Sequence, residues 1–71
     1  MSDIELLKER ISDSGMTMVS VAKKAGISRV TLYNRLNGKG EFIAPEIVGL
    51  TKALNLSKTD RENIFFSKGS M

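Results

Sequence analysis

Apolar residues recur at helical spacing in the first segment of the chain. Ile4, Leu7 and Ile11 fall on one face of a helix with about 3.6 residues per turn. The stretch Ser2-Asp3-Ile4-Glu5 has the pattern of a capping box, which opens a helix, and Ser14-Gly15 is typical of a helix end. The pattern therefore predicts a first helix between these two signals.

Two short helices are predicted next. Thr17 is suited to cap a second helix, which Gly26 ends because glycine adopts the left-handed conformation at low cost. Its inward-facing positions are Met18, Val21, Ala22 and Ala25. Ser28 is a good N-cap for a third helix from about Arg29 to Leu36, which turns Leu32 and Leu36 inward.

The second half of the chain predicts two more helices. After a turn at residues 37–40, Phe42 and Ile43 return the chain to the core, and Pro45 suits the first turn of a fourth helix. The apolar face of that helix consists of Ile47, Val48, Leu50, Thr51 and Leu54. Either Ser57 or Thr59 caps a fifth helix, and residues 67–71 are expected to fray.

Five helices and no strand predict one compact all-α domain over residues 1–71. Its core is expected to contain Ile4, Leu7, Val21, Ala22, Ile27, Leu32, Leu36, Ile47, Leu50, Leu54, Leu56 and Ile64.

The composition excludes several classes of protein. The chain has no cysteine and no histidine, so disulfides, ordinary zinc sites and the usual general base are absent. We expect no enzyme, no cofactor, no metal and no small-molecule ligand. The charged first fifteen residues do not fit a secretory signal, and no apolar run approaches the roughly 18 residues that span a bilayer. A cytoplasmic protein with no membrane contact is therefore expected.

Charge is distributed unevenly along the chain. The net charge is +3, but the 27 residues between Asp13 and Glu41 contain no acidic residue. The five basic residues of this acid-free segment are Lys23, Lys24, Arg29, Arg35 and Lys39. Such a segment fits a surface that lies against phosphates, where a carboxylate would be repelled.

The second and third predicted helices have the features of a helix-turn-helix at about residues 17–36. Ala22 is small where the two helices cross, Gly26 reverses the chain, and Ile27 and Leu32 hold the angle from inside. The third helix then presents Arg29, Val30 and Asn34 as base-reading residues, since these side chains suit guanine, a thymine methyl group and adenine. Phosphate contacts are predicted for Thr17, Ser28, Thr31, Tyr33, Arg35, Asn37 and Lys39. Simpler roles stay open for three of these residues. Val30 could pack inward, Asn34 could be an ordinary solvated helix residue, and Tyr33 could simply shield the surface without a hydrogen bond to phosphate.

The stretch "VAKKAGISRVTLYNRLNGKGEF" resembles the DNA-binding headpieces of lac-repressor-type regulators. Together with "EIVGLTKALNLS" it is more similar to the five-helix domain of lambda-type repressors and Cro proteins, above all to short Cro-like regulators of temperate phages from Gram-positive bacteria. The resemblance covers about residues 4–66. It implies a lambda-repressor-like fold and a transcriptional repressor that binds double-stranded operator DNA as a homodimer.

Two positions depart from these families. Met18 stands where a phosphate-binding Gln is common, and Arg35 stands where a buried aliphatic residue is usual. The stem of Arg35 would lie over the core with its head in solvent or on a phosphate, or else the third helix ends differently.

Other functions remain compatible with the sequence. The same fold could serve a modulator, or antirepressor, that binds a second phage repressor protein, and Met18 favours this alternative. An antitoxin would need a neighbouring toxin gene. Phe65 and Phe66 are the predicted dimer or partner interface, because one helical face cannot bury two adjacent residues and at least one should be exposed.

Overall fold

The computed structural model describes residues 2–66, and within them every regular element is an α-helix. The five helices are α1 (Ile4–Ser14), α2 (Met18–Ala25), α3 (Arg29–Leu36), α4 (Ala44–Ala53) and α5 (Lys58–Phe65). This confirms the predicted all-α fold and each predicted helix. The expectation for residues 67–71 lies outside the described residues.

Local capping signals account for most helix boundaries. Thr17, Ser28 and Ser57 each accept a hydrogen bond from the backbone N–H three residues later, so Ser57 rather than Thr59 caps α5. Gly26 has φ +76° and ends α2, as predicted. The first cap differs from the prediction: the side chain of Asp3, not Ser2, accepts from the N–H of Leu6.

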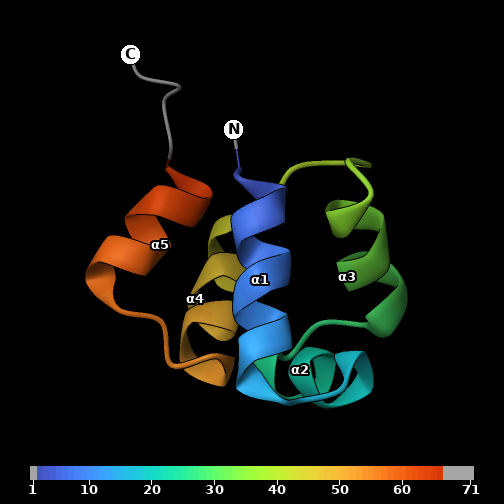
Figure 1. The fold of residues 1–71 in the computed structure, drawn as a ribbon. Helices are drawn as coiled ribbons and strands as arrows, with labels where there is room; N and C mark the ends of the chain where they lie inside the picture. Colours follow the sequence, from blue (N-terminus) through green and yellow to red (C-terminus); the bar gives the residue numbers. More distant parts are fainter. Residues whose placement is uncertain (1, 67–71) are drawn as a thin grey trace.

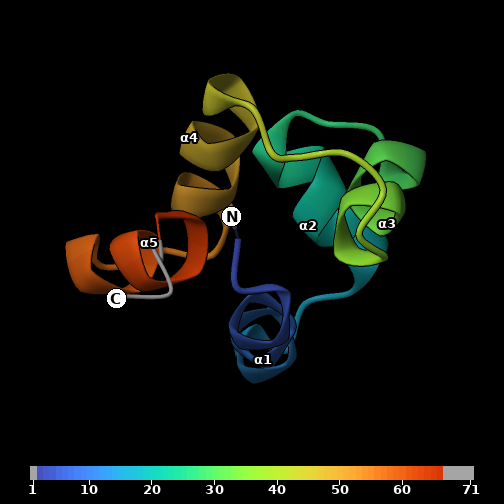
Figure 2. The ribbon, with the colours of Figure 1, turned by 90° about the horizontal axis from the view of Figure 1, so that it is seen from above.

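The helices enclose one core. α1 and α4 lie in the middle, with α5 on one side of them and α2 and α3 on the other (Figures 1 and 2). α2 packs most extensively against α4. The backbone N–H of Asp3 donates to the carbonyl of Ile64, and Arg10 forms an ion pair with Asp60 at 3.5 Å, so α1 is tied to α5 at its start and again beyond its middle.

Most predicted core residues are inside. Seven of them are buried, namely Leu7, Val21, Ala22, Leu32, Leu36, Leu50 and Ile64. Ile4, Ile27, Ile47, Leu54 and Leu56 pack against this core but are only partly buried. Of the two residues predicted to return the chain to the core after the turn, only Phe42 does so. It is buried against Phe65, with ring centroids 5.4 Å apart, whereas Ile43 is 54% exposed.

α2 and α4 cross closely at Gly49. Gly49 is in the middle of α4, and a Cβ atom there would overlap the carbonyl oxygen of Ala25. Only glycine lets the two backbones approach this closely. The crossing anchors α2 and, through it, the position of α3.

Candidate nucleic-acid interface

The turn between α2 and α3 is built from backbone hydrogen bonds and two caps. The N–H groups of Gly26 and Ile27 donate to the carbonyls of Lys23 and Ala22, which closes the end of α2. Ser28 then caps α3 through its bond to the N–H of Thr31, at 3.0 Å. Two eight-residue helices are thus joined by three residues, with Leu32 fully buried behind the second of them.

The outer face of α3 carries most of the predicted base-reading residues. Arg29 and Val30 are exposed, and Val30 is exposed to 67%, so it does not pack inward. Tyr33 is 45% exposed on the same helix. Asn34 is only partly exposed, and its backbone carbonyl accepts from the N–H of Lys39 at 2.8 Å. The exposed part of α3 therefore offers one guanidinium, one isopropyl group and one phenol.

Hydroxyl groups border this face at the helix N-termini. Thr17 and Ser28 are exposed and cap α2 and α3. The hydroxyl of Ser28 also donates to Thr31 Oγ1 at 2.9 Å, which brings the two predicted phosphate ligands together at the start of α3. The turn after α3 exposes Asn37 and Lys39. These positions are compatible with phosphate contacts on both sides of the recognition helix.

Arg35 does not belong to this exposed set. Its Nε and Nη2 lie 3.2 and 3.3 Å from the two carboxylate oxygens of Glu46 at the start of α4. The side chains of Arg35 and Glu46 are only 22% and 8% exposed. A phosphate contact at Arg35 stays a prediction, but the guanidinium is already bound by a carboxylate here, because α4 brings Glu46 against the end of α3.

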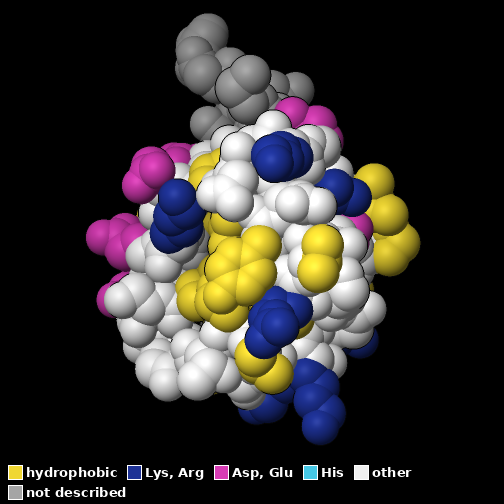
Figure 3. All heavy atoms as spheres, turned by 90° about the vertical axis from the view of Figure 1, so that its right-hand side faces the viewer, with side chains coloured by type: hydrophobic (Ala, Val, Ile, Leu, Met, Phe, Trp, Pro, Cys, Tyr) yellow, Lys and Arg dark blue, Asp and Glu magenta, His cyan; other side chains and the backbone are white. Residues whose placement is uncertain are grey.

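The remaining cations keep the face basic. Lys23, Lys24, Arg29 and Lys39 are all exposed, and none has an ion-pair partner among residues 2–66. Figure 3 looks onto this side of the molecule and shows Lys and Arg side chains between apolar ones, with acidic side chains only towards its edges. Such a surface attracts a polyanion and offers apolar contacts within it.

Comparison with protein-family models decides the family. A model described as Helix-turn-helix matches residues 6–60, which is 55 of the 71 residues. The chain belongs to the helix-turn-helix family. Its five-helix arrangement agrees with the lambda-repressor-like form of this fold, and the family consists of DNA-binding regulatory domains. Comparison with curated proteins and with solved structures gives no significant match.

The two phenylalanines at the end of the helix-turn-helix domain have different environments. Phe65 is 5% exposed and belongs to the core, so it is not available to an interface as predicted. Phe66 is 52% exposed, which confirms that one of the pair is at the surface. It lines a hollow of about 410 Å³ between α4 and α5, hereafter the α4–α5 hollow, together with Ala44, Ile47, Val48 and Arg61.

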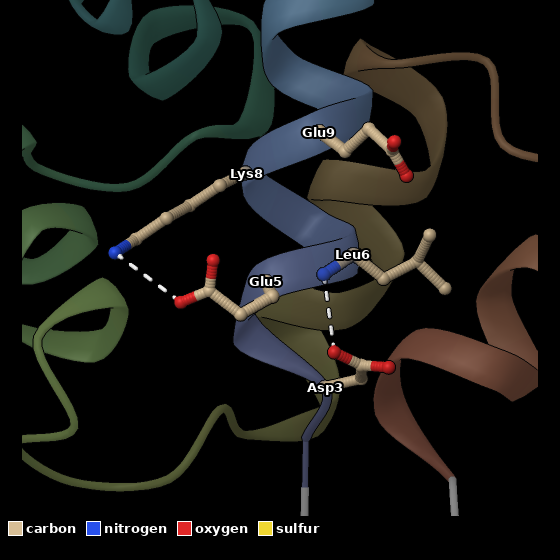
Figure 4. Close-up of a pocket in the computed structure, with 5 residues that line it drawn as sticks. All are labelled: Asp3, Glu5, Leu6, Lys8 and Glu9. Carbon is tan, nitrogen blue, oxygen red and sulfur yellow. Dashed lines mark hydrogen bonds and ion pairs between the residues drawn. The ribbon is translucent and has the colours of Figure 1, made fainter.

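The acidic residues at the start of α1 border a hollow of their own. This surface hollow lies on α1 and is lined by Asp3, Glu5, Leu6, Lys8 and Glu9 (Figure 4). Asp3 caps the helix and Glu5 pairs with Lys8 at 3.9 Å, so these groups have structural or solvated roles. Residues 2–66 contain no cluster of His, Cys, Asp or Glu that could hold a metal ion. Within the same residues, no helix is long and apolar enough to cross a membrane.

The pattern of the sequence does not predict the roles of two residues that shape the domain, Glu46 and Gly49. The signal for Glu46 is Arg35, an arginine at an expected aliphatic position, which needs a carboxylate partner. The signal for Gly49 is the glycine itself, since a glycine inside an apolar helical pattern often marks a close helix crossing. Met18 stands where a phosphate-binding Gln is common. In this structure it is the first residue of α2 and its apolar side chain packs partly against the core.

Proposed function

We propose that this helix-turn-helix protein is a sequence-specific transcriptional regulator, a Cro-like repressor, which reads operator DNA with α3 in the major groove. The observation that supports it most is the exposure of Arg29 and Val30 in the first turn of α3, where recognition helices contact bases. Asn34 completes the proposed base-reading set. Thr17, Ser28, Thr31, Tyr33, Asn37 and Lys39 are its proposed phosphate contacts.

The protein acts as a homodimer on a palindromic operator. One recognition helix buries too little surface for tight specific binding, so two copies read half-sites about 34 Å apart. The α4–α5 hollow supports a self-contact, because Phe66 stands exposed at its edge, with Val48 also exposed to 51%. The resemblance to phage regulators of Gram-positive bacteria suggests regulation by the protein's own concentration and by competition at shared operators.

Arg29→Ala and Lys39→Ala are expected to weaken DNA binding in different ways. Arg29 reads a base edge, so its loss costs about 1–3 kcal/mol on the operator and much less on scrambled DNA. Lys39 neutralises a phosphate, so its loss weakens binding to both duplexes. It also reduces the salt slope, which is the steepness with which the logarithm of the binding constant falls with the logarithm of the salt concentration, by about one. The measurement is a titration of parent and variants at two salt concentrations, with the operator first selected from a random library by the parent protein.

The outcome of this titration also separates the proposal from its alternative. Equal losses for Arg29→Ala on operator and scrambled duplex would remove the base-reading role. If the parent protein binds no duplex at low salt, the alternative is favoured, namely a modulator that binds a partner repressor. The exposed side chain of Phe66 is the observation that supports this alternative.

Phe66→Ala is expected to raise the dissociation constant of the homodimer about 30-fold, since a buried aromatic anchor at an interface contributes about 2 kcal/mol. Sedimentation analysis over a range of concentrations measures this change. Val19→Ala is the matched control, because Val19 is equally exposed at 52% but lies on α2. A parent protein that is monomeric at high concentration, with an identical variant, would refute self-association through Phe66.

A further inference from the structure

Arg35 is held at three points. Besides the two contacts with Glu46, its Nη1 donates to the backbone carbonyl of Lys39 at 3.3 Å. The guanidinium thus connects the last turn of α3, the turn that carries Lys39, and the start of α4. A bidentate, charge-assisted pair of this kind is stronger and more directional than a single hydrogen bond.

Glu46 is itself fixed in place. Its Oε1 also accepts from the backbone N–H of Ile43 at 3.1 Å, and Ile43 has no side-chain acceptor with which to cap α4. Gly40, with φ +86°, lets the loop pass close to the guanidinium, because a Cβ atom there would lie 2.6 Å from Arg35 Nη1. The cap of α4 therefore holds the carboxylate where it neutralises Arg35, and Gly40 leaves room for the guanidinium beside it.

This pairing removes one cation from the basic face. Arg35 is one of five basic residues in the acid-free segment, and it is the only one of the five with a carboxylate partner in the described residues. It lies beside the turn of Lys39, a proposed phosphate contact. An unpaired guanidinium there would add sequence-independent attraction to any DNA.

We propose that Glu46 restrains sequence-independent DNA binding by holding the Arg35 guanidinium in an internal ion pair. This inference rests on the proposed DNA-binding function. Glu46 acts through Arg35 and touches no DNA, so it is a positioning residue. The restraint matters because the many non-operator sites in a cell compete with the operator for the protein, in proportion to their sequence-independent affinity.

Glu46→Gln is expected to strengthen binding to a random-sequence duplex about 5- to 10-fold at 0.1 M salt and to steepen the salt slope by about one. Glutamine can still accept from the N–H of Ile43, but it no longer neutralises the guanidinium. A purely structural role of Glu46 predicts the opposite sign, since a loosened loop would weaken binding. Circular dichroism and thermal melting establish that each variant is folded.

Two further variants complete the test. Glu62→Gln makes the same change in net charge at an exposed site on α5, on the other side of the molecule from α3, and should leave the salt slope unchanged (Figure 1). The double variant Arg35→Met with Glu46→Gln removes the charge of both partners, so that neither charge is left buried without its counterpart. Its affinity and slope should equal those of the parent protein.

The results distinguish this inference from the proposed function. If the parent protein binds DNA but Glu46→Gln weakens binding or leaves the slope unchanged, the restraint is refuted and the function stands. If the double variant loses about one unit of slope relative to the parent, Arg35 is a phosphate contact and the inference is overturned, even should Glu46→Gln fail to fold. If the parent binds no duplex at low salt, the proposed function fails and the restraint with it.

Discussion

Replacing Leu32 by alanine is expected to lower the free energy of unfolding by about 2–5 kcal/mol, the range for a large side chain removed from a core. Leu32 is fully buried, on the inner side of α3, directly behind the exposed face. In a chain of 71 residues, a loss of this size is a large part of the total stability. Thermal or urea denaturation followed by circular dichroism measures it.

The same helix provides the control for Leu32. Val30→Ala removes a comparable apolar side chain two residues away, but from a position that is 67% exposed. It should change stability by no more than about 0.5 kcal/mol. A melting temperature that Leu32→Ala leaves unchanged would mean that the packing of α3 on the core is misassigned.

Gly49→Ala is expected to destabilise the domain by about 3 kcal/mol or more, the upper end of the range for overpacked sites. Helix propensity alone predicts the opposite, since alanine in a helix interior is about 1 kcal/mol more favourable than glycine. The steric cost dominates because the new methyl group would meet the carbonyl oxygen of Ala25, which belongs to the backbone of α2 and cannot rotate away as a side chain could.

Denaturation of the Gly49→Ala variant tests this crossing, with Lys52→Ala as control. Lys52 is exposed in the same helix, so its replacement should change stability by no more than about 0.5 kcal/mol. The displacement of α4 should also reach α3 through α2 and weaken binding to DNA of any sequence. A Gly49→Ala variant that melts at a higher temperature than the parent would contradict the close approach of α2 and α4.

The environment of a predicted site residue could be predicted from the sequence only where its neighbours lie close to it along the chain. The exposure of Arg29, Val30 and Tyr33 follows from the position of Leu32 and Leu36, which lie on the same helix and turn it inward. Helical periodicity predicts the orientation of neighbours on the same helix. It does not predict the contact with Glu46, which is eleven residues beyond Arg35 and on another helix.

Phe65 and Phe66 illustrate the same limit at the end of α5. Periodicity indicates that two adjacent residues cannot both face one core, and one of them is indeed exposed. Which one is buried depends on where α5 rests against the rest of the domain. Phe65 is the buried residue because its ring packs edge to face against Phe42, which lies in the loop before α4.

By itself, the sequence determined the five helices, the turn at Gly26, the cap at Ser28 and the basic character of the α3 face. Each of these depends on residues within about one helical turn of one another, where hydrogen-bond partners and apolar spacing can be read directly. Only the tertiary structure decided which charges remain free, which phenylalanine is exposed and how closely α4 approaches α2. These outcomes depend on contacts between elements far apart in the chain, whereas the spacing of apolar residues describes one helix at a time and does not identify the residues that pack against it.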